Sequence, residues 1–251
     1  MNKNKKGFTL IIITLIVLFL IGIVIMICYK LMTEPQKIET NNFDHKNCSY
    51  VIEGKNITLK NGYSEELIPN SNSKTITQYF GNEKMTDLNN DGLNDVVFIL
   101  TQTMGGSGTF YYLAVALRND ECKGTNAILL GDRIAPQGVE IRDNNIFVNY
   151  ADRKAEEAMT SSPSIGITKE FVLNGNTLKD ITTEEAKKEQ SCLMSGGTIE
   201  SSICCTSTSD FPNLCLVGAC GCSPTNSHQV KTCICGEDKC FNGDECAPLM
   251  R

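Results

Sequence analysis

The chain has 251 residues, 13 cysteines, two histidines and no tryptophan. Its 23 basic and 29 acidic side chains give a net charge of −6, which excludes the basic surface that nucleic-acid binding needs. One block near the N-terminus is almost purely apolar, and ten cysteines lie between Cys192 and Cys246. This uneven distribution excludes a simple cytosolic globule.

The apolar block covers residues 8–28, which are 21 consecutive positions without a charge. A helix of that length spans about 30 Å, the thickness of a bilayer's hydrocarbon core. Lysines precede the block, so the positive-inside rule predicts a cytoplasmic N-terminus and an extracytoplasmic remainder. We therefore predict a transmembrane anchor over residues 1–32, in a single-pass membrane protein. A cleaved secretory signal is the alternative, although its apolar region usually has about 7–15 residues.

A second alternative comes from the segment Lys6-Gly7-Phe8-Thr9-Leu10, which resembles the processing site of type IV prepilins. In those families a peptidase cuts after the glycine, and a glutamate usually stands five residues into the mature chain. Here that position is Ile12. The resemblance implies a pilin-like filament or secretion component, and cleavage after Gly7 would distinguish it from the uncleaved anchor.

A polar linker over residues 33–46 leads into a predicted β domain, residues 47–181. Short β-like runs alternate here with turn signals such as Asn61-Gly62, and Asp143-Asn144-Asn145 predicts a hairpin turn. The predicted strands are Ile57–Lys60, Thr75–Phe80, Val96–Thr101, Phe110–Leu117, Ala127–Leu130, Gly138–Arg142, Ile146–Tyr150 and Thr168–Leu173. The fold class is therefore mainly β, with an antiparallel arrangement, an N-terminal transmembrane helix and a small C-terminal module.

The segment Asp87–Asp95 carries oxygen-bearing side chains at its positions 1, 3, 5 and 9 and glycine at position 6. That spacing wraps a loop around a hard cation, because alternate side chains point inward and glycine permits the turn. We predict one structural calcium. An Asx-rich turn without a metal is the alternative. The predicted ligands are Asp87, Asn89, Asp91 and Asp95 through their side chains, and Leu93 through its carbonyl oxygen.

All cysteines except Cys28 are predicted to form disulfides. Exported proteins retain such bridges, and a short cysteine-rich segment needs them because it has too little apolar surface for a core. Cys48 and Cys122 are expected to pair within the β domain. Residues 182–191 form a predicted helical linker, and residues 192–251 a disulfide module with five bridges and undetermined pairing. The cysteines of this module are Cys192, Cys204, Cys205, Cys215, Cys220, Cys222, Cys233, Cys235, Cys240 and Cys246. Zinc held by Cys220, Cys222, Cys233, Cys235 and His228 is the alternative.

Several segments of the β domain resemble an uncharacterised domain of exported and lipoprotein-like bacterial chains. They are Gln78–Asn82, Asp87–Asp95, Gly105–Tyr112, Leu130–Pro136 and Val148–Arg153. The run from Asp210 to Gly243 resembles a cysteine-rich module of exported microbial proteins. The resemblance of the β domain implies an envelope location, and neither resemblance implies a chemistry.

The function expected from these features is binding or envelope organisation, with an envelope protein or surface ligand as partner and no enzymatic activity. A cysteine-rich inhibitor and a hydrolase remain alternatives. Hydrolysis would require acids such as Asp132 and Asp152 to meet in a cleft.

Overall fold

A computed structural model describes residues 19–26, 43–118, 122–216 and 220–249. The chain divides into two compact units, residues 1–42 and 43–251. In the first unit, Phe19–Met26 form a helix with exposed side chains. Gly7 and the rest of the predicted membrane span lie outside the described residues. Among those described, no helix combines the length and the hydropathy that a membrane crossing requires.

The second unit is mainly β, as predicted. Its sandwich strands are β1 (Ser49–Ile52), β2 (Lys55–Thr58), β3 (Tyr63–Leu67), β4 (Lys74–Thr86), β5 (Asp95–Thr103), β6 (Phe110–Leu117), β7 (Lys123–Asp132), β8 (Ala135–Arg142), β9 (Asn145–Asp152), β10 (Ile165–Asn174) and β11 (Thr177–Asp180). The helix α2 (Glu184–Met194) follows, and then β12 (Thr198–Cys205), β13 (Ser227–Ile234), β14 (Lys239–Phe241) and β15 (Cys246–Pro248). Two short 3-10 helices, η1 (His45–Asn47) and η2 (Pro224–Asn226), complete the elements.

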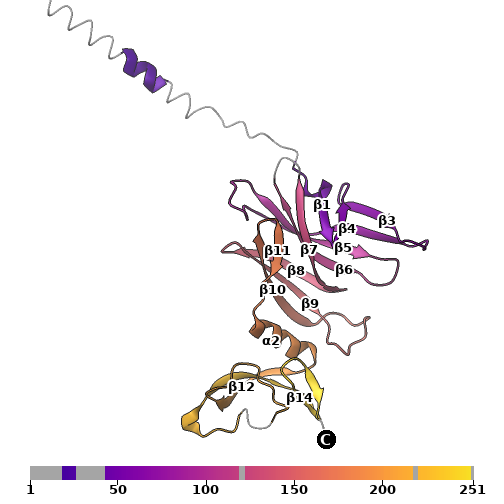
Figure 1. Cartoon of the computed structure of the whole chain (residues 1–251), viewed down its shortest axis with the longest axis vertical. Coiled ribbons are helices and arrows are strands. Elements are labelled where there is room, and N and C mark those ends of the chain that lie inside the picture. Colours follow the sequence, from indigo (N-terminus) through magenta and orange to yellow (C-terminus); the bar gives the residue numbers. More distant parts are fainter. Residues whose placement is uncertain (1–18, 27–42, 119–121, 217–219, 250–251) are drawn as a thin grey trace, which may run out of the picture. The chain divides into compact units, whose positions relative to one another are not determined.

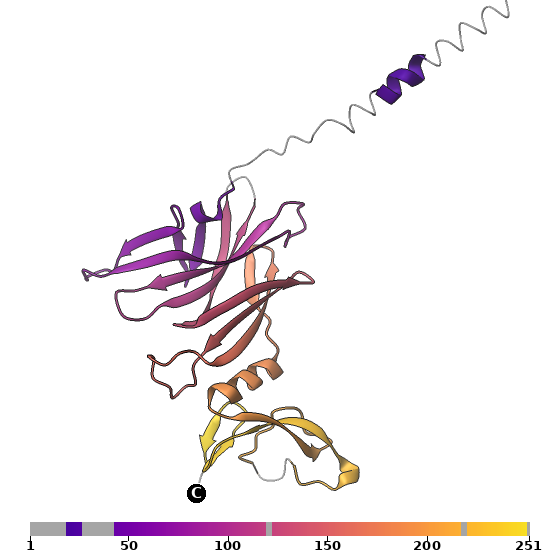
Figure 2. The ribbon, with the colours of Figure 1, turned by 180° about the vertical axis from the view of Figure 1, so that it is seen from behind.

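Two sheets make up the sandwich (Figures 1 and 2). The larger has the order β2-β1-β7-β6-β5-β4-β3 and the smaller β11-β10-β9-β8. The pairs within both sheets are antiparallel except β1–β7, which is parallel. The predicted antiparallel arrangement is therefore confirmed apart from that one pair. The turn Asp143-Asn144 joins β8 to β9 with φ values of 49° and 62°, which is the geometry of a type I′ hairpin.

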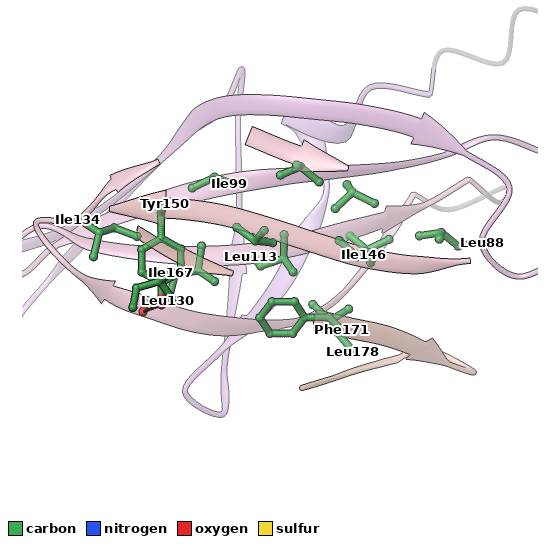
Figure 3. Close-up of a cluster of buried hydrophobic side chains, with 14 of the residues drawn as sticks. Leu88, Ile99, Leu113, Leu130, Ile134, Ile146, Tyr150, Ile167, Phe171 and Leu178 are labelled. Atoms are coloured by element: carbon green, nitrogen blue, oxygen red, sulfur yellow. Dashed lines mark hydrogen bonds between the residues drawn. The ribbon is translucent and has the colours of Figure 1, made fainter. Parts of the chain in front are cut away.

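The facing sides of the two sheets enclose the main core (Figure 3). Ile99 and Leu113 come from the larger sheet, and Ile146, Tyr150 and Phe171 from the smaller. Burial of these side chains is the main favourable term that holds the sheets together.

The larger sheet also curls around a second core. The ring of Tyr50 on β1 lies 5.4 Å from that of Phe98 on β5, although β7 and β6 separate these strands in the sheet order. The strand β5 is therefore buried on both faces. Val97 and Ile99 lie in the main core, and Phe98 lies in the second core. This explains its continuous apolar sequence.

The folded unit begins at Phe43, before the predicted domain start at residue 47. His45 in η1 packs against the rings of Tyr79 and Phe98, with centroid distances of 5.4 Å and 5.1 Å. Its carbonyl oxygen accepts the hydroxyl of Tyr50 at 2.6 Å. The end of the expected linker is thus part of the β domain and covers one end of the second core.

The predicted helical linker is present as α2, which begins after Thr183 and extends beyond the predicted end at residue 191. The Thr183 hydroxyl accepts the backbone N–H of Ala186 at 3.2 Å. The Thr182 hydroxyl accepts the N–H of Glu170 on β10 instead. The helix continues to Met194, so Cys192 lies in its last turn.

Candidate functional site

The predicted calcium loop joins β4 to β5. Its second residue, Leu88, is buried in the main core and holds the loop against the sandwich (Figure 3). Gly92 has φ +84°, a conformation that glycine adopts without strain, at position 6 of the loop. Position 9, Asp95, is the first residue of β5.

The side chains of the half-buried Asp87 and of the exposed Asn89 and Asp91 accept hydrogen bonds from the loop's own backbone. The Asp87 carboxylate accepts the N–H groups of Asp91 at 3.1 Å and Gly92 at 2.9 Å. Asn89 Oδ1 accepts the Asp91 N–H at 3.0 Å, and Asp91 Oδ1 accepts the Leu93 N–H at 2.8 Å. These bonds are those of an Asx-rich turn.

Asp95 differs from the other acids of the loop because it is fully buried, with 0% exposure. One carboxylate oxygen accepts the Leu88 N–H at 3.1 Å and the other the Arg118 N–H at 3.0 Å. Burial raises the pKa of this carboxyl group, with a further contribution from the charges of Asp91 and Asp87, against the two hydrogen bonds that lower it.

The donor set of this loop matches calcium in kind, since carboxylate and amide oxygens are the ligands of a hard cation. The structure brings all five predicted ligand residues into one turn. The carboxylate oxygens of Asp87, Asp91 and Asp95 do not form a close cluster, however. Across the described residues, the one group of three potential ligand atoms within 4.8 Å of one another is sulfur, from Cys233, Cys235 and Cys246.

Those sulfurs belong to disulfides, and the C-terminal region is disulfide-rich as predicted. Twelve cysteines form six bridges, one of them in the sandwich and five in the C-terminal region. The pairs are Cys48–Cys122, Cys192–Cys233, Cys204–Cys220, Cys205–Cys222, Cys215–Cys240 and Cys235–Cys246. Because a bridged sulfur is not a thiolate ligand, the zinc alternative is wrong for this oxidised form. His228 Nε2 lies 2.7 Å from the Thr208 carbonyl oxygen instead.

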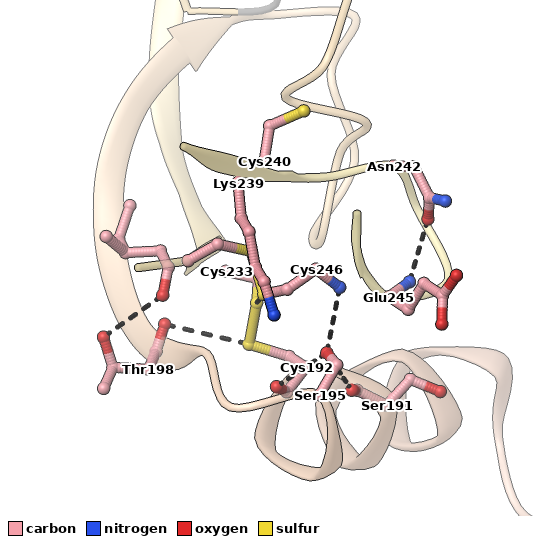
Figure 4. The surroundings of a disulfide bond; sticks show 12 residues. Ser191, Cys192, Ser195, Thr198, Cys233, Lys239, Cys240, Asn242, Glu245 and Cys246 are labelled. Carbon is pink, nitrogen blue, oxygen red and sulfur yellow. Dashed lines mark hydrogen bonds between the residues drawn. A yellow bond between two sulfur atoms is a disulfide. The ribbon is translucent and has the colours of Figure 1, made fainter. Parts of the chain in front are cut away.

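The bridge Cys192–Cys233 connects α2 to β13 (Figure 4). The Ser195 hydroxyl donates to the carbonyl oxygens of Ser191 and Cys192 at 2.7 Å and 3.1 Å, and its oxygen accepts the Cys246 N–H at 3.0 Å. The end of the helix is therefore part of the disulfide core.

The two acids of the hydrolase alternative, Asp132 and Asp152, have different surroundings. Asp132 accepts the Thr109 N–H at 2.9 Å and two N–H groups of Arg133, at 3.1 Å and 2.7 Å. Burial alone would raise the pKa of Asp132, but these bonds and the charges of Arg133 and Arg153 lower it. Arg153 donates to the carbonyl oxygens of Ser161 and Arg133. Asp152 lines a cavity, whose other lining residues do not include Asp132.

That cavity has a volume of about 370 Å³ and lies between the inner side of the smaller sheet and α2. Leu130, Tyr150 and Ile167 give it an apolar floor, while Asp152 and Lys169 place charges in it. Burial raises the pKa of the Tyr150 hydroxyl, and the charges of Asp152 and Asp180 raise it further. The hydroxyl donates to the Leu130 carbonyl oxygen at 3.1 Å.

Sequence reasoning did not identify this cavity. One sequence feature could have indicated a polar site here. The charged Lys169 lies at an alternate position of β10, between the apolar residues Ile167 and Phe171. Comparison of the chain with protein-family models, with curated proteins and with solved structures finds no match.

Proposed function

We propose that this protein acts outside the cytoplasm as an anchored binding protein. In this proposal the apolar run 8–28 is the membrane anchor, and the folded unit from Phe43 onward faces an oxidising compartment. Its partner is an envelope protein or a surface ligand.

The observation that carries the proposal is the set of six disulfides. Disulfides persist in secreted and periplasmic proteins, whereas cytosolic thiol systems keep cysteines reduced. The C-terminal core contains two large apolar side chains that are fully buried, Phe211 and Phe241, so the bridges supply cohesion that apolar burial does not.

Charge supports the same location. Beyond residue 37 the sequence contains 18 basic and 28 acidic side chains. Such a surface stays soluble and is repelled by anionic lipid headgroups, so the folded unit would extend from the membrane rather than lie on it.

Calcium at the Asp87–Asp95 loop is part of the proposal as a structural ion. The oxygen spacing supports it, and the loop lies against the core through Leu88. A cation there would neutralise the charges of Asp87, Asp91 and Asp95 and hold the β4–β5 connection in one conformation.

The proposed location is tested by labelling intact cells that express the full chain with a membrane-impermeant amine reagent. The folded unit carries exposed lysines, including Lys55, Lys60 and Lys179, so we expect these positions to be labelled without lysis. A cytoplasmic protein serves as the control for cell integrity. Labelling that appears only after lysis would contradict the proposed location.

A further inference from the structure

The inner side of the smaller sheet changes from apolar to charged along three adjacent strands. Side chains alternate along a strand, so Asp152 lies on the same side of β9 as the buried Val148 and Tyr150. By the same alternation, Lys169 of β10 lies on the side of Ile167 and Phe171.

The third charged position is on β11. Asp180 lies two residues after the buried Leu178 and is paired in register with Phe171 of β10. Three successive strands thus place a charge on the side of the sheet that carries their buried apolar residues, half-buried at Asp152 and Lys169 and exposed at Asp180, where β11 ends. Departures from pattern of this kind concentrate at functional sites.

All three charges line the cavity of about 370 Å³, whose volume falls within the range of small-ligand pockets, about 300–1,000 Å³. The opposite wall is α2, which contributes Gln190 and Met194. The apolar floor of Leu130 and Tyr150 and the charged rim are therefore presented to one space.

The ammonium group of Lys169 has no partner among the residues that the structure describes. It is half-buried, and no ion pair or side-chain hydrogen bond engages it among the described residues. The other lysine of the cavity, Lys187, is bonded to Glu184 at 2.7 Å. An unpaired charge on the inner side of a sandwich lowers stability unless a ligand or solvent compensates it.

Each aspartate keeps one oxygen available. Asp152 accepts the Arg153 N–H through Oδ1 at 2.7 Å, and Asp180 accepts the Thr182 N–H through Oδ1 at 2.9 Å. The second oxygen of each carboxylate makes no hydrogen bond within the described part of the chain. Within the described ranges, the cavity thus combines an unpaired lysine, two carboxylates that each have an oxygen without a hydrogen bond, and an apolar floor.

We propose that this cavity binds a small zwitterion of the amino-acid class with an apolar side chain. The ligand carboxylate pairs with Lys169, its ammonium group pairs with Asp152 and Asp180, and its side chain packs on Leu130 and Tyr150. The inference rests on the proposed function only in taking binding as the activity.

The test is calorimetric titration of the detergent-solubilised full chain with L-leucine, L-methionine, L-valine and L-phenylalanine. We expect saturable one-to-one binding of at least one of them. The amide of that amino acid lacks the carboxylate and its N-acetyl form lacks the ammonium group. Each should bind at least about tenfold more weakly, because each loses a charge-assisted contact. No binding of any of the four, or equal binding of the parent and both derivatives, would overturn the proposal.

Variants separate recognition from folding. Lys169→Met should weaken binding at least about tenfold while leaving the melting temperature unchanged or raising it, because it replaces an unpaired charge with an apolar chain of similar length. Lys179→Met on the outward side of β11 is the matched control and should change neither quantity. A Lys169→Met protein that melts lower would indicate a structural lysine and would contradict the proposal.

Asp152→Asn provides a second test if Lys169→Met folds poorly. It should weaken binding of the free amino acid but not of its N-acetyl derivative, because the lost charge faces the ligand's ammonium group. Equal weakening of both would overturn the proposed orientation. Failure of these titrations would leave the cell-labelling result unaffected, so the two proposals can fail separately.

Discussion

At the scale of single residues, Asp95 connects three segments of the sandwich. Its buried carboxylate begins β5 and accepts N–H groups from Leu88 in the loop and Arg118 after β6. A buried backbone N–H without a partner lowers the free energy of unfolding by about 1–3 kcal/mol. The Asp95 side chain therefore stabilises the fold even without a metal.

Replacing Asp95 by alanine should therefore lower the free energy of unfolding by about 2–5 kcal/mol in EDTA, because two N–H groups lose their acceptor. Urea denaturation of the folded unit, residues 43–251, measures this. Glu66→Ala on β3, where the carboxylate is exposed, should change it by less than about 0.5 kcal/mol. Equal effects of the two substitutions would contradict the role given to Asp95.

His45 gives the fold a dependence on pH. It is 8% exposed, and burial lowers its pKa despite the Glu83 carboxylate, whose Oε2 lies 3.3 Å from Nε2. Lys46 lowers the pKa further and Asp44 opposes this. The folded state thus favours the neutral ring. The stability that this gives is complete above the unfolded pKa near 6.5 and is lost as the pH falls below it.

We expect unfolding by urea to become easier from pH 7.5 to pH 5.5, with a smaller change in His45→Phe, which keeps an aromatic ring against Tyr79 and Phe98. The control is His228→Gln, at an exposed histidine. If wild type and His45→Phe lose stability equally over this range, His45 is not the cause.

At the scale of elements, the sequence predicted the sandwich strands better than their arrangement. Each of the eight predicted strands overlaps an observed one, because Phe110–Leu117 and similar runs are dense in β-branched and aromatic residues. The strands β1, β3 and β11 were not predicted, since they are short or polar. The parallel β1–β7 pairing depends on contacts distant in sequence, which local patterns do not encode.

The two candidate sites also differ in how far the sequence could predict them. The Asp87–Asp95 loop is contiguous, so its spacing could be read directly from the sequence. The cavity near α2 requires residues from several strands and a helix. Of its charged strand positions only Lys169 lies inside an apolar pattern, because Asp152 and Asp180 end their strands. The sequence predicted the pair Cys48–Cys122, which the structure contains, but not the pairing in the C-terminal region, because its ten cysteines allow many connectivities.

The loop itself yields a prediction about calcium. With a dissociation constant near 10⁻⁴ M, typical of extracellular modules, 10 mM calcium would stabilise the protein by about 2.7 kcal/mol. Asp91→Ala should abolish this gain while changing stability in EDTA by less than about 1 kcal/mol, because its side chain is exposed. Asp143→Ala in the β8–β9 turn should retain the gain. Identical melting of the wild type in calcium and in EDTA would exclude the structural ion.

The bridge Cys192–Cys233 closes a segment of 41 residues and connects α2 to β13. Replacing both cysteines by alanine should lower the stability of the C-terminal region by about 2–4 kcal/mol. Hydrogen exchange should show the loss in β12 and β13 and not in β5 or β6. Removal of Cys48–Cys122 is the matched control, with the loss expected in the sandwich. Loss of protection across both regions in each variant would show that they unfold as one unit.

At the scale of the whole molecule, the sandwich and the disulfide region are coupled mainly through α2. Surface ion pairs also connect them, such as Lys231 with Glu185 at 2.8 Å and Lys239 with Glu156 at 3.1 Å. Exposed pairs of this kind contribute about 0–1 kcal/mol each. The covalent bridge at Cys192 and the Ser195 contacts at the end of α2 are therefore the main connection.

The central claim is that the folded unit matures in an oxidising compartment with its cysteines paired. The most direct measurement is the intact mass of the protein purified from its native membrane after alkylation without reduction, together with its metal content. We expect the loss of two hydrogens for each of six disulfides, no alkylation of the twelve paired cysteines, and one bound calcium. Several alkylated cysteines among those twelve, with zinc in place of calcium, would contradict it.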